Sequence, residues 1–256
     1  SDLAMVKPIA LRMFNLNPVE FDDMIGEVES RLLEEADYTL ELDRSIELSA
    51  SCKHIPNLHF PKYYPQFSGD RILTMDWIEG MPLGERIKLG NINREEGNTL
   101  GQALWDFYHY QIHTLRTLHA DPHPGNFIID GNGKLGVIDF GCVKVIPAEF
   151  YSVYFQLLDK NILKQPEQLM DVFYKLRFIY KDDTEQERKF FVEVFTHLVE
   201  LLGRPFRSAH FDFSQKMYFE ELYKFGDDIS KMKAFRESKK ARGVKDALYI
   251  NRTYYG

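Results

Sequence analysis

The stretch HADPHPGNFIIDGNGKLGVIDFG, residues 119–141, constrains this chain more than any other. Two short apolar runs, 127–130 and 134–140, flank a Gly-Asn-Gly sequence, and such a turn between apolar runs predicts a tight β-hairpin. Because a hairpin brings its two outer ends together, we expect Asn126, before the first strand, and Asp139, at the end of the second, to lie side by side.

The spacing of the polar residues is typical of a site that handles phosphoryl groups. Asn126 follows Asp121 by five residues and precedes Asp139 by thirteen. Phosphoryl transfer needs hard oxygen ligands for Mg²⁺ and one oxygen acceptor aimed at the attacking group. Asn126 and Asp139 are therefore the candidate Mg²⁺ ligands, and Asp121 is the candidate acceptor. Proline and glycine between Asp121 and Asn126 stiffen and bend the connecting loop.

Two other interpretations of these residues stay open. The matches could be coincidental, since Asp is common in turns, although three matches at fixed offsets around a hairpin seldom arise by chance. Alternatively, His119, Asp121 and His123 alternate as HxDxH and could bind a transition metal in a hydrolase. That interpretation leaves Asp139 unexplained, and we expect His119 to buttress the loop instead.

A GxGxxG sequence, the fingerprint of a nucleotide-binding loop, also occurs here at Gly131, Gly133 and Gly136. In that fingerprint the glycines lead into a helix whose N-terminus binds phosphate. The residues that follow here predict a strand. We therefore interpret the three glycines as part of the hairpin.

A helix start precedes these motifs at Asn17, where Asn is followed by Pro at the first helical position and Glu at the third. The apolar stripe that follows, at spacings of four, three and four residues, continues at Glu35. If the helix runs on, Glu41 lies about 120° around from Glu35. Either glutamate alone could be an ordinary surface residue, but a core-facing Glu is expected to be paired or functional.

Taken together, the sequence resembles the UbiB family of atypical protein-kinase-like enzymes, also called ADCK or aarF-domain kinases. The residues that carry the resemblance are EADY at 35–38 with Glu41, RILTMDWIEG at 71–80, HADPHPGN and DFG. Choline and aminoglycoside phosphotransferases share HxDxxxxN, but the glutamate helix separates this chain from them. The resemblance implies an α+β, protein-kinase-like fold, with an incomplete N-lobe over residues 1–77 and a mostly helical C-lobe over residues 78–256.

The resemblance also implies roles for individual residues, with Mg²⁺ and ATP or ADP as cofactors. Asp121 matches the catalytic-loop aspartate, Asn126 and Asp139 match the metal ligands, Glu41 matches the glutamate that pairs with the nucleotide-contacting lysine, and Glu35 matches an acid that meets a lysine of an N-terminal extension. The backbone carbonyl of Asp76 and the amide of Ile78 would meet adenine.

One part of a kinase-like site is not found in the sequence. Such a site needs a glycine- or alanine-rich loop and a strand lysine before the glutamate helix. Lys7 is the only lysine before Asn17, no Val-Ala-Ile-Lys strand surrounds it, and the family's Lys-x-Gly-Gln signature is absent. We therefore expect the first strands to be missing and residues 1–256 alone to turn over nucleotide weakly or not at all. The alternative is a non-catalytic kinase-like module that binds a partner protein or lipid.

Composition adds limits on partners and location. A net charge of −7 argues against general nucleic-acid binding. Two cysteines give no disulfide framework, which favours a reducing compartment, and no 18-residue apolar run is present to span a bilayer. We therefore expect a cytoplasmic protein with possible peripheral membrane contact. A basic cluster near the end could be a solvated face or, since the family implies work near membranes on prenyl-quinone pathways, a patch for anionic lipid. It consists of Lys231, Lys233, Arg236, Lys239, Lys240, Arg242 and Lys245.

The remaining pattern predicts a buried strand over residues 71–77 and a helix from about residue 94 up to the catalytic loop. Helices such as 150–163 and 188–203 are expected afterwards. No APE-like segment, which docks peptides in ordinary protein kinases, follows DFG. This favours a small-molecule or lipid-linked substrate, or ATP hydrolysis coupled to another protein. The family resemblance implies a prenyl-quinone intermediate as such a substrate and a protein of a quinone-pathway complex as such a partner.

Overall fold

The computed structural model describes residues 37–232 and 242–243. The helix predicted from Asn17, Glu35, Lys7 and most of the basic cluster lie outside these residues. Contacts divide the chain into two units, 1–145 and 146–256. The family resemblance implies a lobe boundary between residues 77 and 78. The division by contacts does not test that boundary, which stays a prediction.

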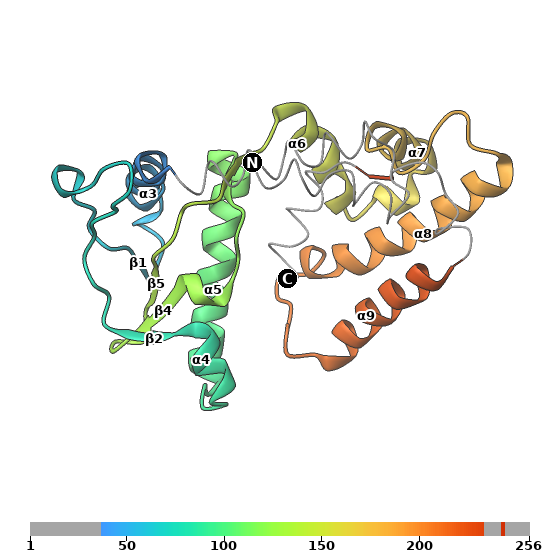
Figure 1. Ribbon diagram of the computed structural model, residues 1–256. Helices are drawn as coiled ribbons and strands as arrows, with labels where there is room; N and C mark the ends of the chain where they lie inside the picture. The colour runs from blue at the N-terminus through green and yellow to red at the C-terminus, as the bar shows by residue number, and fades with distance from the viewer. Residues whose placement is uncertain (1–36, 233–241, 244–256) are drawn as a thin grey trace, which may run out of the picture. The chain divides into compact units, whose positions relative to one another are not determined.

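The first unit carries every described residue of the candidate site (Figure 1). Its helices are α3 (Tyr38–Cys52), α4 (Leu83–Lys88) and α5 (Arg94–Tyr110), with a π-helical turn at Gln111–Leu115 and a 3-10 turn at Pro124–Asn126. Its strands are β1 (Leu58–His59), β2 (Gly80–Pro82), β3 (Thr117–His119), β4 (Phe127–Asp130), β5 (Leu135–Val137) and β6 (Val143–Val145).

The predicted hairpin is confirmed as β4 and β5, which pair antiparallel in a sheet of order β1-β5-β4-β2. Asp130 shapes its turn, because Oδ1 accepts hydrogen bonds of 2.8 Å from the backbone N–H groups of Asn132 and Lys134. Gly133 adopts φ +75°, a conformation that glycine reaches without strain. The GxGxxG glycines are thus hairpin residues, as the sequence predicted.

The sheet buries one face and turns the other toward the connection before β2. Phe127 and Ile129 of β4 are buried, together with Leu135 and Val137 of β5, whereas Ile128 and Asp130 are partly exposed. The alternation in β4 follows from the two-residue period of a strand, whereas all three residues of β5 are buried. The same pattern fixes the hairpin register, since a slip by one residue would expose the buried face.

Gly80 allows β2 to approach β4, and we predict that Gly80→Ala destabilises the protein by about 1–3 kcal/mol. A Cβ at this position would overlap the backbone carbonyl oxygen of Ile129. Gly101→Ala in α5 is the matched control, because a Cβ at Gly101 would meet nothing within 4 Å. This substitution should stabilise the helix by about 0.5–1 kcal/mol. Urea unfolding measures both changes, and equal effects would contradict the steric argument.

One sequence prediction about secondary structure is wrong, and two hold only over part of their length. Residues 71–77 form only isolated bridges at Ile72 and Met75, and the side chain of Trp77 is 91% exposed, so no buried strand forms there. The helix predicted from about residue 94 is confirmed as α5, which begins at Arg94, but the α-helix ends at Tyr110 and a π-helical turn follows it. The region predicted as helix 150–163 is a seven-residue helix followed by 3-10 turns.

The second unit is helical among its described residues. It contains α6 (Ala148–Tyr154), α7 (Pro166–Lys175), α8 (Glu185–Gly203) and α9 (Lys216–Lys231), joined in part by 3-10 turns. The predicted helix 188–203 is therefore confirmed within α8. Figure 1 shows α8 and α9 side by side, and their contact includes a 3.2 Å hydrogen bond from the Tyr218 hydroxyl to the Leu201 carbonyl. No helix in the described ranges is long and apolar enough to cross a membrane.

Candidate active site

Backbone pairing brings the two ends of the candidate motif together. β3 ends at His119, and β6 pairs with it antiparallel, so that His119 lies opposite Val143. The pairing continues one residue further, where the Ala120 N–H donates to the Cys142 carbonyl at 2.9 Å. The loop that contains Asp121 therefore begins beside the segment that follows Asp139.

Asn126 closes the loop on Asp121. Its Nδ2 donates to both the Asp121 carboxylate, at 3.0 Å from Oδ2, and the Asp121 backbone carbonyl, at 3.1 Å. With the amide nitrogen engaged in this way, Oδ1 is the acceptor that Asn126 presents on its other side. The Asn126 carbonyl also accepts from the Ile138 N–H at 3.1 Å, which places Asn126 next to the residue that precedes Asp139.

Helix α3 contributes a second carboxylate beside Asp139. Asp139 Oδ1 accepts a 2.8 Å hydrogen bond from the Gly141 N–H. A Cβ on Gly141 would lie 3.3 Å from that Oδ1 and 3.7 Å from Glu41 Oε2, so the two carboxylates converge around this glycine. Arg44, one turn further along α3, donates from Nη1 to the Gly141 carbonyl at 3.0 Å. The helix and the DFG segment are thus tied together.

The electrostatics of this corner favour a cation. Burial raises the pKa of Glu41, and the negative charge of Asp139 raises it further. Among the described residues, no lysine or arginine forms an ion pair with Glu41. The oxygens of two converging carboxylates are hard donors of the kind that Mg²⁺ prefers. The part of the chain that the structure describes contains no group of three or more His, Cys, Asp and Glu residues that could hold a metal ion.

His119 is a structural residue of the loop. It is fully buried, its backbone N–H donates to Gln111 Oε1 at 2.8 Å, and its ring packs against Phe140. Burial lowers its pKa, an effect opposed by the charges of Asp139 and Asp121. His123, in contrast, is exposed and accepts from the Gly125 N–H through Nδ1. The two histidines therefore lie in different environments, one buried and one exposed, which argues against a shared metal site in HxDxH. The buried position of His119 fits the buttressing role expected from the sequence.

Gln111 is a positioning residue that the sequence analysis missed. It is fully buried, and its Nε2 donates to the Phe107 carbonyl at 3.2 Å while its Oε1 holds the N–H of His119. A signal was present, because Leu100, Ala103 and Phe107 form the buried stripe of α5 and Gln111 is the next position in that stripe. A polar residue at an apolar position indicates a specific hydrogen-bonding role.

The helix that carries Glu41 starts later than a helix running on from Asn17 would require. Asp37 has non-helical dihedral angles and caps α3, accepting 3.1 Å hydrogen bonds from the N–H groups of Thr39 and Leu40. The condition under which Glu35 and Glu41 would share one continuous helix is therefore not met. Glu35 itself lies outside the described residues.

Asp76 and Ile78 lie at the opposite end of the hairpin from Asp139. They line a pocket of about 440 Å³, together with His59, Trp77 and the turn residues Asp130 and Asn132. The Ile78 side chain packs on β5, because a Cβ on Gly136 would lie 2.8 Å from Ile78 Cδ1. At about 3.3 Å per strand residue, the four residues of β4 separate the pocket from the acidic corner by about 13 Å. Only an extended ligand could reach from this pocket to the carboxylates of Asp139 and Glu41.

We predict a pH dependence of stability that comes from Glu41. A carboxyl group whose pKa is raised in the folded state stabilises the fold while protonated, and this contribution is lost as pH rises from about 4.5, the ordinary value, through the raised pKa. For one proton the slope is at most about 1.4 kcal/mol per pH unit. Urea unfolding across this pH range should show that Glu41→Gln loses less stability with rising pH than the wild-type protein does. Glu47→Gln, exposed on the same helix, is the control and should behave as the wild type.

Comparison with known proteins defines the class. The fold matches the solved structure of the Rv3197–erythromycin complex from Mycobacterium tuberculosis, with a TM-score of 0.70 and 22% identity, over 99% of this chain and 61% of that one. A model of the ABC1 atypical kinase-like domain matches residues 1–173. The fold is thus the protein-kinase-like ABC1 fold, as predicted. The chain belongs to the ABC1 atypical kinase-like family, which includes the aarF-domain kinases that the sequence resembled.

Two relatives illustrate how far the similarity reaches. Protein ACTIVITY OF BC1 COMPLEX KINASE 1, chloroplastic, from Arabidopsis thaliana is 28% identical over 62% of this chain and 23% of its own length. Atypical kinase COQ8, mitochondrial, from Saccharomyces cerevisiae is 26% identical over 78% of this chain and 40% of its own length. The chain thus spans well under half of either relative.

Proposed function

We propose that this chain binds a Mg²⁺–nucleotide complex and transfers or hydrolyses the terminal phosphoryl group. The observation that carries the proposal is the joining of Asp121 to Asn126 by a 3.0 Å hydrogen bond, in the same unit in which Asp139 and Glu41 converge. Membership of an atypical kinase-like family supports it.

In this proposal each side chain has one task. Asn126 Oδ1 and the Asp139 carboxylate would hold Mg²⁺, which when bound neutralises charge on the phosphate oxygens. The hydrogen bond from Asn126 orients the Asp121 carboxylate, which would accept the proton of the attacking hydroxyl or water. Arg44 keeps the DFG segment against α3, and Gln111 fixes the start of the loop through His119. The Glu41 carboxylate would interact with a cation, either by forming an ion pair with a lysine or by contacting the metal.

In this proposal the adenine of the nucleotide would lie in the pocket at the hairpin turn. Asp76 is held there by two hydrogen bonds, from its N–H to the Lys62 carbonyl at 2.9 Å and from the Tyr64 hydroxyl to its Oδ1 at 2.7 Å. The Asp76 carbonyl and the Ile78 amide remain our candidates for adenine contacts. A nucleotide extended along the hairpin would then direct its phosphates toward Asp139.

The test separates nucleotide binding from turnover. Asp121→Asn should leave the Kd for Mg·ATP within about threefold of the wild-type value and lower the rate of ATP hydrolysis by about 10²–10⁴. Calorimetry measures the first quantity and phosphate release the second. The exposed residue Asp70 provides the control Asp70→Asn, which should change neither. Nucleotide binding by the wild-type chain that shows no dependence on Mg²⁺ would instead support a non-catalytic module for a protein or lipid partner.

We extend the proposal to the phosphoryl acceptor, which we expect to be a small molecule or a lipid-linked compound of prenyl-quinone metabolism. The similarity to COQ8 and to the chloroplastic kinase supports this extension. The predicted cytoplasmic location, with peripheral membrane contact, stays a prediction, since those two relatives are named as mitochondrial and chloroplastic. Unchanged prenyl-quinone content in cells that lack the protein would contradict the extension.

A further inference from the structure

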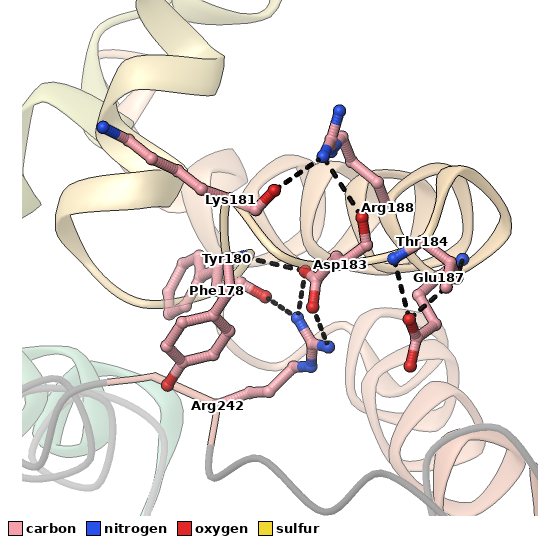
Figure 2. Close-up of polar contacts among 8 residues, drawn as sticks. All are labelled: Phe178, Tyr180, Lys181, Asp183, Thr184, Glu187, Arg188 and Arg242. Carbon is pink, nitrogen blue, oxygen red and sulfur yellow. Dashed lines mark hydrogen bonds and ion pairs between the residues drawn. The ribbon is translucent and has the colours of Figure 1, made fainter.

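A buried carboxylate in the second unit binds an arginine from far along the chain. Asp183 lies in the loop between α7 and α8, with a side chain that is 0% exposed. Its Oδ1 and Oδ2 accept hydrogen bonds of 2.9 Å from Nη2 and Nη1 of Arg242, which is 59 residues away (Figure 2). This two-pronged geometry joins a planar guanidinium to a planar carboxylate, and the lysine ammonium cannot reproduce it.

The guanidinium is enclosed on its face as well as its edge. Nη1 of Arg242 also donates to the Phe178 carbonyl at 3.1 Å, and Cζ lies 3.5 Å from the centre of the Phe191 ring. The arginine side chain is only 3% exposed. An aromatic face and three acceptor contacts together make a site that is specific for guanidinium rather than for positive charge in general.

The site is built by residues other than Arg242. Asp183 Oδ2 accepts from the Tyr180 N–H at 2.7 Å, which fixes the carboxylate. Arg188 Nη2 donates to the backbone carbonyls of Lys181 and Asp183, each at 3.2 Å. The next residue, Thr184, forms a capping box with Glu187 that begins α8, as Figure 2 shows. The loop is therefore organised from within.

Gly243 adds a second element of recognition. Its N–H donates to the Arg177 carbonyl at 2.9 Å, and its φ of +89° is one that L side chains rarely adopt. A Cβ there would lie 3.4 Å from Phe178 Cε1. The loop therefore contacts both the arginine side chain and the backbone of the glycine that follows it.

We propose that the α7–α8 loop is a recognition site for an arginine–glycine dipeptide, which the chain fills with its own Arg242-Gly243 and which a peptide of the same sequence can fill in trans. This proposal is independent of the nucleotide site. It also removes Arg242 from the basic cluster, since a buried arginine bonded to Asp183 cannot contribute to a surface patch for lipid.

The test uses the full chain with Arg242→Ala and a labelled peptide of residues 239–245, KKARGVK. Fluorescence anisotropy should show that this variant binds the peptide at least about tenfold more tightly than the wild-type chain, whose site is already filled. The same peptide with Arg242→Lys, which keeps its charge, should bind about tenfold more weakly, as should the peptide with Gly243→Val. Adding Asp183→Ala to the variant chain should abolish binding. Equal binding of the arginine and lysine peptides would overturn the proposal.

A second measurement needs no variant and therefore does not depend on the folding of one. Phenylglyoxal, which modifies accessible guanidinium groups, should react with exposed Arg94 at least about tenfold faster than with Arg242 in the wild-type chain. Added KKARGVK peptide in large excess should raise the rate at Arg242 relative to the rate at Arg94, because it competes for the loop; the ratio cancels the reagent that the arginine of the peptide itself consumes. Equal rates at the two arginines, or no effect of the peptide, would overturn the proposal.

Discussion

Asp183→Asn is expected to destabilise the protein by about 3–5 kcal/mol, the range typical when one partner of a buried ion pair is removed. The substitution keeps the shape of the side chain and removes its charge. Arg242, 3% exposed and bonded to both carboxylate oxygens, would then be a buried cation without its counter-charge. Chemical denaturation followed by far-UV circular dichroism measures the change.

A surface ion pair provides the matched control. Asp171 and Lys175 form an i,i+4 pair in α7, with side chains that are 58% and 53% exposed. Asp171→Asn should therefore change stability by less than about 1 kcal/mol. The double variant Asp183→Asn, Arg242→Met should lose less than the sum of its single substitutions, because it removes both buried charges. If Asp183→Asn were no more damaging than Asp171→Asn, the energetic importance of this pair would be refuted.

Asp139→Asn should weaken Mg²⁺-dependent nucleotide binding by about 100-fold or more, given that even residues that only support metal ligands contribute 10–100-fold to metal affinity. The substitution replaces a charged ligand with a neutral amide. It also removes the negative charge that helps raise the pKa of Glu41, so this pKa should move back toward its ordinary value.

Titration of a fluorescent ATP analogue, with Mg²⁺ and with EDTA, measures this effect. Binding in EDTA should be the same for both proteins, since Asp139 would act through the metal. Asp70→Asn, exposed in the same unit, is the control and should keep the full Mg²⁺ dependence. Persistence of that dependence in Asp139→Asn would exclude Asp139 as a ligand.

The local parts of the fold were predictable from the sequence. The hairpin followed from the Gly-Asn-Gly turn between apolar runs, and Asp130 and Gly133 form that turn through contacts within five residues. The closeness of Asp121 and Asn126 likewise follows from a five-residue loop stiffened by proline. Such features depend on neighbours in the chain, which a sequence pattern records directly.

Features that depend on distant contacts were not predictable. The apolar run 71–77 resembled a buried strand, but burial requires partner strands, and Ile72 and Trp77 are instead 62% and 91% exposed. Arg242 lies among lysines in the sequence and was grouped with them, because nothing near it in the sequence shows that its partner Asp183 lies 59 residues earlier.

One local feature was missed although the sequence contains its signal. The start of α3 after Asp37 was detectable in principle, since Asp is a favourable N-cap residue.

The most direct test of the proposed site is a crystal structure of the protein with Mg²⁺ and a non-hydrolysable ATP analogue. We expect Oδ1 of Asn126 and one carboxylate oxygen of Asp139 to bind the same Mg²⁺ at about 2.0–2.1 Å, with Asp121 facing the terminal phosphate. An analogue whose Mg²⁺ is bound by neither residue, or oxygens of 126 and 139 that point into separate regions, would contradict the account.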